Sequence, residues 1–407
     1  MTWASLVDDA VEHRVVAWRR EFHAHPELSF EEVDTTSAIA RLLDQWRIPY
    51  ERPLATGLVG HLRGERPGLK IAVRCDIDAL PIAEENSFPF ASKDAGRMHA
   101  CGHDGHTAIL LGLAETLSSR RGEISGEVRL IFQPGEEVVR SGARELIEHG
   151  AIDDVDMVIG LHLMTDLESG YISLGAGPIM ASTDEFRIRI VGKGGHGGYP
   201  HDTIDSLVVA CSLVGEIQTL VSRRVNPFEP VAITVGTIRG GSAYNVIAGT
   251  TEVTGTVRTF SENIRQRLEV ELTNLAIGHA SAHGAEAIVS YLSGHPALVN
   301  DEAVVQSLRP AAAAVVGVDH VLLTSPVMAG EDFAFYAQKA PSAFAFVGAR
   351  NSVAGATYPH HNPHFTIDED SLAIGLRFYL AALQRLLSPQ QTPSSARVGS
   401  GPQPKVD

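Results

Sequence analysis

Three stretches of the 407-residue chain decide the expected fold: LKIAVRCDIDALP (69–81), EVRLIFQPGEE (127–137) and VDMVIGLHL (155–163). Each contains a short apolar run that gives way to polar residues. Segments with an apolar helical pattern, such as TAILLGLAETL (107–117), lie between these strands. A further strand and a further helix are expected at 343–350 and 371–387. Strands that alternate with helices are typical of a mostly parallel sheet with helices on both faces. We therefore predict an α/β fold.

The N-terminal region favours two helices. Apolar residues recur at three- and four-residue steps in the first of them: Val7, Val11, Val15, Trp18 and Phe22. This is one face of a 3.6-residue period, and Pro26 should end the helix near His25. The second helix is expected to carry Ile39, Leu42, Leu43 and Trp46.

The pattern changes near residue 180. From there to residue 293 the order strand, helix, two strands, helix, strand is expected, and the strands alternate apolar and polar residues as antiparallel strands with one solvated face do. We predict a discontinuous main domain over 1–180 and 294–388, an inserted α+β unit over 181–293, and a disordered tail over 389–407. The tail is predicted from its richness in Pro, Ser, Gly and Gln.

Composition narrows the class of protein. Hydrophobic residues make up 44% of the chain and charged residues 20%, which is enough apolar material for a core. The 33 Lys and Arg against 49 Asp and Glu give a net charge of −16, which argues against nucleic-acid binding as the main role. The three Cys contain no CxxC pair, and we see neither a secretory signal nor an apolar run of about 18 residues. We expect a cytoplasmic protein without a membrane segment.

Polar residues gather where the predicted strands end. Asp76 and Asp78 follow the first strand, Gln133 with Glu136 and Glu137 follow the second, and His162 is expected to end the third. The loop YPHHNPHF (358–365) follows the last strand, and HACGHDGH (99–106) leads into a helix. Ligands bind beyond the carboxyl ends of parallel strands, and Cys, His and Glu are donors for zinc, manganese or cobalt. The sequence therefore predicts a metal site at this edge.

Simpler explanations exist for each signal. Two adjacent Glu residues usually lie on a solvent-exposed face, and Asp76 and Asp78 could be helix caps. Isolated His residues are more often ordinary surface or core residues, which is our interpretation of six: His13, His61, His149, His279, His283 and His295. Four strand-end clusters of suitable donors nevertheless favour a metal site.

Eight motifs carry a family resemblance: RCDIDALPI, HACGHDGHTA, IFQPGEE, GLHL, GGHGGYPH, NVIAGTTEVTGTVRTF, GEDFAFY and HHNPHF. In this order they resemble the amidohydrolase branch of the M20 metallopeptidases, which includes hippurate hydrolases, N-acyl-amino-acid amidohydrolases and auxin-conjugate hydrolases. HPELSFEE (25–32) is similar to the family's opening, and the resemblance spans about residues 15–385. It implies a catalytic domain like that of zinc aminopeptidases, with an inserted ferredoxin-like lid or dimerisation domain.

The resemblance also implies a site for two divalent ions, which could be Zn, Mn, Co or Ni. The implied ligands are Cys101, His103, Glu137, His162 and His361. His360 is adjacent and could compete. Glu136 matches the general base, which would act on a metal-bound hydroxide and later protonate the leaving amine. Asp78 matches a residue that orients a ligand, and Asp76 lies where sister branches carry a metal-binding His.

The inserted unit holds three further matches. His196 matches a residue that reaches a neighbouring subunit's active site and stabilises an oxyanion, which implies a homodimer or domain closure within one subunit. Asn245 and Arg258 match residues near the substrate, and Arg258 suits a carboxylate. Asn245 could equally be a turn residue and Arg258 a surface residue. The implied reaction is hydrolysis of the amide bond of N-acyl amino acids.

Four alternatives stay open. A metallo-carboxypeptidase or dipeptidase of the same family would use the same metal site on short peptides. Cys101 could be the nucleophile of a cysteine hydrolase. GKGGHG (192–197) matches a dinucleotide-binding pattern, although it lies in the antiparallel unit. A protein that stores metal, or a scaffold, would keep the ligands without needing Glu136.

Overall fold

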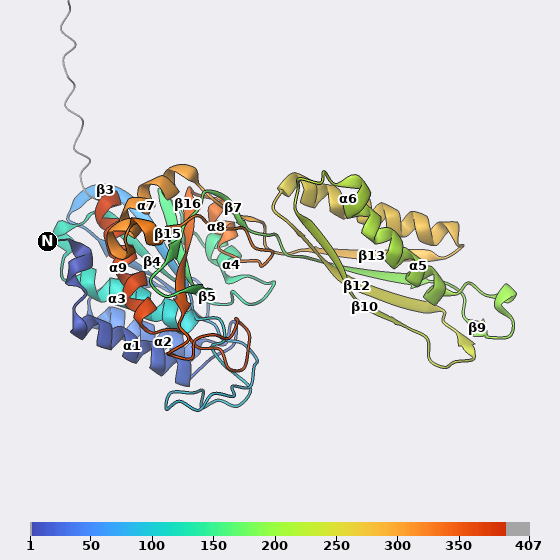
Figure 1. The fold of residues 1–407 in the computed structure, drawn as a ribbon, viewed down its shortest axis with the longest axis horizontal. Helices are drawn as coiled ribbons and strands as arrows, with labels where there is room; N and C mark the ends of the chain where they lie inside the picture. Colours follow the sequence, from blue (N-terminus) through green and yellow to red (C-terminus); the bar gives the residue numbers. More distant parts are fainter. Residues whose placement is uncertain (1, 388–407) are drawn as a thin grey trace, which may run out of the picture.

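The computed structural model describes residues 2–387, so the predicted tail at 389–407 lies outside the described residues. The chain forms two lobes, a large one around a central sheet and a smaller, elongated one (Figure 1). The α-helices are α1 (Asp9–Ala24), α2 (Val33–Gln45), α3 (His103–Ser118), α4 (Gly142–Glu148), α5 (Ser206–Thr219), α6 (Glu262–Ala282), α7 (Glu302–Val316), α8 (Ala334–Ala337) and α9 (Asp370–Leu387). Short 3₁₀ turns are η1 (Trp3–Leu6), η2 (Arg121–Glu123), η3 (Pro200–Asp202) and η5 (Val318–His320), and η4 (Leu220–Arg224) is a π-helix.

The strands of the large lobe are β1 (Tyr50–Glu51), β2 (Leu58–Arg63), β3 (Arg66–Asp76), β4 (Ser125–Gln133), β5 (Met157–Glu168), β6 (Ile172–Ser173), β7 (Gly177–Met180), β14 (Leu298–Asn300), β15 (Val321–Leu322) and β16 (Ser342–Arg350). Those of the smaller lobe are β8 (Asp184–Val191), β9 (Gly195–His196), β10 (Val231–Gly240), β11 (Val246–Ile247), β12 (Thr250–Thr259) and β13 (Glu286–Ser293). The predicted helices at the N-terminus are present as α1 and α2.

The central sheet has the strand order β1-β2-β4-β3-β5-β16-β6-β15. Its middle strands, β4, β3, β5 and β16, are mutually parallel neighbours, whereas β1 and β2 are antiparallel additions at one side. This mostly parallel sheet confirms the predicted α/β class. It also places the four predicted strand-end clusters on adjacent strands that run in the same direction.

Successive strand residues face opposite layers of helices, as the twofold period of a strand requires. Ile71 and Val73 of β3 pack into the core shared with α1, α3, α7 and α9, while Ala72 packs into the core shared with α4 and α8. Both faces of the sheet are therefore buried, which explains why the sequence shows continuous apolar runs here.

The prediction that His162 ends its strand is wrong. β5 continues to Glu168, because residues beyond His162 pair with β16 in parallel register: Leu163 with Val347, and Met164 with Gly348. The pairing of β5 with β3 stops at Gly160, whereas β3 stays paired with β4 as far as Asp76, so His162 lies just past the last β3–β5 pair. The residue keeps its place near the strand-end cluster for this reason.

The smaller lobe is an antiparallel sheet of order β10-β12-β8-β13. Helices α5 and α6 cover one face, and their core contains Ile188, Val253, Leu213 and Leu268. The opposite face carries no helix in this part of the structure, and β9 lies at the end farthest from the central sheet (Figure 1). The predicted order of elements in this unit is present.

One helical stretch, Ser206–Arg224, is long and apolar enough by composition to cross a membrane, although no such run was expected. Its apolar residues Val209, Leu213 and Ile217 pack into the core of the smaller lobe. This packing accounts for part of the apolar character of the helix, since 33% of the apolar window is buried.

Candidate metal centre

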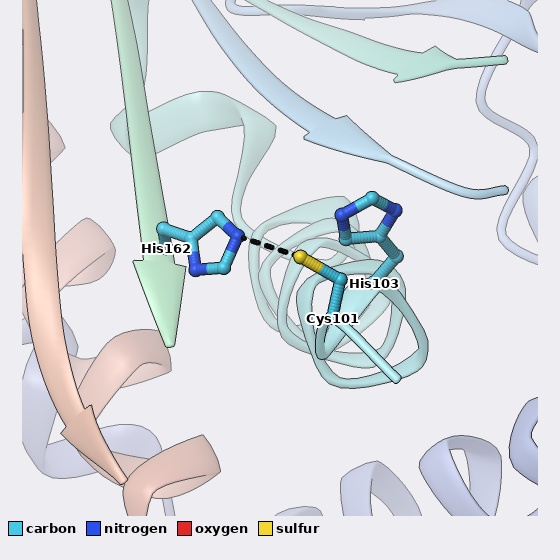
Figure 2. Close-up of side chains that lie close together, drawn as sticks. All are labelled: Cys101, His103 and His162. Carbon is cyan, nitrogen blue, oxygen red and sulfur yellow. Dashed lines mark hydrogen bonds between the residues drawn. The ribbon is translucent and has the colours of Figure 1, made fainter. Parts of the chain in front are cut away.

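The side chains that follow the parallel strands converge at one edge of the central sheet. Cys101, His103 and His162 have donor atoms within 4.8 Å of one another, and so do Cys101, Glu137 and His361. Cys101 and His103 come from the start of α3, whereas His162 comes from β5 and faces the Cys101 sulfur (Figure 2). All five predicted ligands therefore lie in two groups that share Cys101.

The turn into α3 gives Cys101 and His103 their positions. Gly102, the residue between them, has a φ of 90°, which an L side chain rarely adopts. The helix starts at the next residue, so His103 is fixed on its first turn. The glycine in HACGH therefore allows two donors two residues apart to face one site.

Two of the imidazoles are held so that one ring nitrogen is left for another partner. His162 Nδ1 lies 2.9 Å from the Leu163 carbonyl oxygen, and its Nε2 lies 3.5 Å from Cys101 Sγ. His103 Nδ1 lies 2.9 Å from the carbonyl oxygen of Asp78 and 3.2 Å from its carboxylate. With each Nδ1 as the donor, both Nε2 atoms carry the lone pair that a metal ion requires.

The third imidazole approaches from the loop after β16. His361 Nε2 comes within 3.3 Å of Glu137 Oε1. His361 has a left-handed φ of 63°, and its N–H donates to the Ala100 carbonyl beside Cys101. Strained backbone of this kind persists where the surroundings hold it, and functional sites are common examples. Its neighbour His360 is engaged elsewhere, with Nε2 2.9 Å from the Leu163 carbonyl oxygen.

The residues present fit a pair of metal ions. Within residues 2–387, His103 Nε2 is buried and makes no hydrogen bond, and Glu137 Oε1 is buried and faces His361 Nε2 at 3.3 Å without a hydrogen bond of good geometry. Buried polar atoms without partners are uncommon in folded proteins. A thiol, three imidazoles and a carboxylate are also the donor set that divalent transition metals select. The unpaired atoms and the donor set therefore point to the same site.

The electrostatics of the site favour cations. Burial raises the pKa of the Cys101 thiol well above its ordinary value, and Glu137 and Glu136 raise it further. Burial opposes a charge on His103, but Asp76 and Asp78 raise the pKa of His103 to about 10. Without a bound cation, Cys101 is therefore a thiol at neutral pH, which argues against the cysteine-nucleophile alternative.

Glu136 lies beside this cluster and lines the same cavity. Burial raises the pKa of Glu136 well above that of an ordinary glutamate, and Glu331, Glu137 and Asp332 add to the effect. A carboxylate with a raised pKa accepts a proton more readily. The position and environment of Glu136 suit a general base.

A buried network beneath the site was missed from the sequence. Arg74 donates to Gln133 (2.8 Å), Asp76 (2.8 Å) and Asp332 (2.7 Å). Asp332 also accepts from the Ser141 hydroxyl at 2.8 Å, so the network holds both ends of the loop that carries Glu136 and Glu137. Arg74 and Asp76 are two residues apart on one strand and so share a face, which is the signal that could have revealed it.

His106 was also missed. Its Nδ1 lies 2.6 Å from Asp76, and its Nε2 accepts the Leu163 N–H at 3.0 Å. His106 is three residues from His103 on α3, so both lie on one helix face, and this spacing in HACGHDGH was the available signal. His106 is therefore a partner of Asp76 and not a free donor.

A cavity of about 510 Å³ opens beside the cluster. It is lined by Cys101, Glu136, Glu137, Val138, Val139, His162, Met164, Met180, Thr183, Asp184, Glu185, Arg258, His295, Ala329, Gly330, Glu331, His360 and His361. Arg258 thus lines the same cavity as Cys101, Glu137 and His162. The apolar part of the lining comes from Val138, Val139, Met164 and Met180.

His196 and Asn245 are not among the residues that line this cavity. His196 belongs to β9, which pairs with β11 next to Asn245, at the end of the smaller lobe away from the central sheet (Figure 1). Asn245 accepts the Gly197 N–H through its carbonyl oxygen. GKGGHG leads from the antiparallel strand β8 into β9 and so lacks the parallel βαβ context of a dinucleotide site.

These features define a class of protein: a metal-dependent hydrolase with a dinuclear site at the edge of a parallel sheet. Comparison with known proteins agrees. The sequence profile of Peptidase family M20/M25/M40 matches residues 72–385. The chain is 42% identical over 379 residues to N-acetyl-L-cysteine deacetylase of Bacillus subtilis (strain 168), covering 93% of this chain and 89% of that protein.

Two further similarities are informative. The chain is 46% identical over 296 residues to N-acyl-L-amino acid amidohydrolase of Geobacillus stearothermophilus, covering 72% of this chain and 80% of that one. A crystal structure from Bacillus subtilis, described as a dinuclear metal binding peptidase from the M20 family, matches with a TM-score of 0.81 and 36% identity, covering 93% and 99%. The chain belongs to Peptidase family M20/M25/M40 and is a metal-dependent amidohydrolase with a dinuclear metal cofactor.

Proposed function

We propose that the protein hydrolyses the amide bond of N-acyl amino acids. The observation that carries the proposal is the single cavity that joins the metal-ligating donors and Glu136 to the guanidinium of Arg258. An N-acyl amino acid presents an amide carbonyl and, one carbon beyond the amide nitrogen, a carboxylate. The donor cluster and the Arg258 guanidinium have the chemistry to bind these two groups.

Cys101, His103, Glu137, His162 and His361 are the proposed ligands. Cys101 belongs to both donor groups, so its sulfur would be within reach of either ion. Asp78 orients His103 and Glu137, since its oxygens lie near His103 Nδ1 and accept the Glu137 N–H at 3.0 Å. Asp76 holds His106 and approaches His103, and it stays outside the ligand set. The donors suit zinc, and also manganese, cobalt or nickel.

When bound, two divalent ions lower the pKa of water to about 7 and polarise the amide carbonyl. The protein supplies the proton transfers. Glu136 takes a proton from the attacking water and gives it to the nitrogen of the leaving amino acid. The network of Arg74 and Asp332 keeps the Glu136 loop in place during both transfers.

The two parts of the chain have different proposed roles. Residues 1–180 and 294–388 form the proposed catalytic domain, and 181–293 the proposed lid and dimerisation domain, whose strand order is ferredoxin-like. His196 and Asn245 lie far from the cavity of their own chain, so we propose that His196 serves the site of a partner subunit in a homodimer. There it would stabilise the developing oxyanion, with Asn245 near the substrate. The expected location is the cytoplasm.

A hydrolysis panel tests the proposal. Purified protein loaded with zinc, manganese, cobalt or nickel is assayed for released amine on N-acetyl and N-benzoyl amino acids and on dipeptides. The proposal predicts turnover of N-acyl amino acids that a chelator abolishes. Turnover of dipeptides alone would instead favour a peptidase, and activity that survives chelation would contradict the mechanism.

A further inference from the structure

His361 is held differently from the other proposed imidazole ligands. Its side chain is 53% exposed, so the packing of its own ring does little to fix its position. Its backbone has a left-handed φ of 63°, which residues with a side chain rarely adopt. Such a conformation persists only where surrounding contacts hold it. The position of His361 therefore depends on the contacts that anchor the ligand loop, residues 358–365.

A segment from another part of the chain supplies two of these anchors. Residues 84–86 lie in the long connection between β3 and α3. The Glu85 N–H donates to the Pro363 carbonyl oxygen at 3.0 Å. The side-chain amide of Asn86 donates to the Phe365 carbonyl oxygen at 3.1 Å. Both hydrogen bonds tie the backbone of the ligand loop to the same short segment.

Phe365 connects the second anchor to the metal site. Its side chain is fully buried, and its ring packs against that of His360 with the ring centroids 5.0 Å apart. A Cβ at Gly102 would lie 3.9 Å from the Phe365 ring, so the ring also lies beside the turn that leads into α3. Asn86 therefore holds the backbone of a residue whose ring lies next to both the ligand loop and the start of α3.

Asn86 is itself fixed by a series of buried hydrogen bonds. Its amide also donates to Glu84 Oε1 at 3.0 Å, and the same oxygen lies 3.1 Å from His23 Nε2. His23 Nδ1 lies 2.8 Å from a carboxylate oxygen of Asp104, the residue after His103. The side chains of Glu84, His23 and Asp104 are all buried. The series therefore runs from the first turn of α3 to the ligand loop.

The charge of His23 strengthens this series. Each ring nitrogen faces a carboxylate oxygen, which accepts hydrogen bonds, so both nitrogens donate and the ring is an imidazolium. Burial and the positive charge of Arg19 oppose a charge on His23. The carboxylates of Asp104 and Glu84 outweigh both and raise the pKa of His23 above its ordinary value. Hydrogen bonds between ionised groups are stronger than those between neutral groups, so Asn86 has a firm support.

We propose that Asn86 is a positioning residue that fixes the ligand loop and so sets the affinity of the metal ion that His361 binds. This inference rests on the ligand set of the proposed function. Asn86 is not among the residues that line the cavity, so it acts through the loop. His361 shares a donor group with Cys101 and Glu137, so the effect should fall on one ion and leave the other bound.

Titration of the zinc-loaded protein with a chelator, which gives two dissociation constants, tests this inference. Asn86→Ala removes both side-chain donors and should weaken the binding of one zinc ion by roughly 10–100-fold, with the other affinity unchanged. His361→Ala should weaken the same ion. In the double variant the Asn86 substitution should add little, because a positioning residue acts only through the ligand that it positions. Ser92→Ala, which removes a hydrogen bond to Asp94 in the same connection, is the matched control and should change neither affinity.

Thermal melting verifies that each variant is folded. If Asn86→Ala does not fold, Asn86→Asp takes its place, since it keeps the shape of the side chain but loses the donors. Two wild-type affinities, equal losses for both ions, or a further full loss in the double variant would overturn the role of Asn86 while leaving the proposed function standing. Two wild-type affinities in His361→Ala would overturn the proposed ligand set, and this inference with it.

Discussion

The carboxyl edge of the central sheet and the far end of the smaller lobe both carry residues that the sequence marks as functional. The edge assembles its residues within one chain, since β3, β4, β5 and β16 are parallel neighbours and their ends meet. The far end presents His196 and Asn245 away from that edge (Figure 1). Topology alone thus brings the proposed metal ligands together, whereas the proposed role of His196 at an oxyanion would require a second subunit or a large movement.

The two regions also differ in their surroundings. Glu136 and His103 are buried among charged partners that shift their pKa values. His196 is exposed, and its Nδ1 accepts the Gly198 N–H at 3.0 Å. Substitutions of the buried residues, such as Glu136, should abolish activity at the site of the same chain. A substitution of His196 should be compensated by a partner subunit that carries an intact His196.

The largest expected effect is at the edge. Glu136→Gln removes the proposed base and should lower kcat by roughly 10²–10⁴-fold. The ligands are untouched, so metal content measured by mass spectrometry should stay at the wild-type value. Glu148→Gln, on the exposed side of α4, is the control. Full turnover by Glu136→Gln would remove Glu136 from the mechanism and favour a metal-storage role.

The next effect is at the far end. His196→Ala should lower kcat by about 10²-fold or more, as loss of an oxyanion donor does. Mixing inactive Glu136→Gln with inactive His196→Ala subunits should restore roughly a quarter of wild-type activity, because half of the dimers are mixed and each has one intact site. If no activity returns after verified subunit exchange, His196 does not act at the partner's site. It would then act at the site of its own subunit or take no part in the reaction.

Two buried arginines, one in each lobe, allow the two regions to be compared by the stability of the folded protein. Arg74→Met leaves Asp76 and Asp332 without their cation, and Arg265→Met does the same to Asp184 in the smaller lobe. Each should destabilise the protein by about 3–5 kcal/mol in denaturant unfolding. Arg74→Met should also weaken metal binding by roughly 10–100-fold, whereas Arg265→Met should not. Equal metal affinities in both variants would mean that the Arg74 network does not contribute to metal binding.

The smallest effect concerns Glu32, which accepts the Gly135 N–H at 2.9 Å below the Glu136 loop. Burial raises the pKa of Glu32 to about 7 from the model-peptide value of 4.5, helped by the charge of Asp78. The folded state therefore binds the proton more tightly than the unfolded state. Stability from this group is complete below pH 4.5 and is lost as the pH rises through 7.

Glu32→Gln should therefore stabilise the protein at pH 8, by on the order of 2 kcal/mol, and have little effect at pH 4.5. Urea unfolding at the two pH values measures the difference. The same gain at both pH values would mean that Glu32 does not titrate as described.

The sequence predicted the parts of the molecule that depend on local pattern. Apolar runs and their polar ends indicated the parallel sheet, and donor types at those ends indicated the metal site. The roles of individual ligands came from the family resemblance and stay proposals. The end of β5 was misplaced because pairing with β16 extends the strand past His162, and a single sequence does not reveal such a partner.

Long-range partners explain the other omissions. Arg74 meets Asp332 across 258 residues of sequence, so neither residue suggests the other. His295 looked isolated because Arg258 and Thr183, which line the same cavity, come from β12 and from the residue before β8, far from His295 in the sequence. A single sequence shows these residues but does not show that they lie close together in space.

The most direct test of the account is the metal content of each chain after chelation and reconstitution, measured together with turnover. Wild type should bind two ions and recover activity, while His103→Ala and Glu137→Ala should each bind fewer ions and remain inactive. Two ions retained in both variants, with turnover unchanged, would contradict the proposed ligand set.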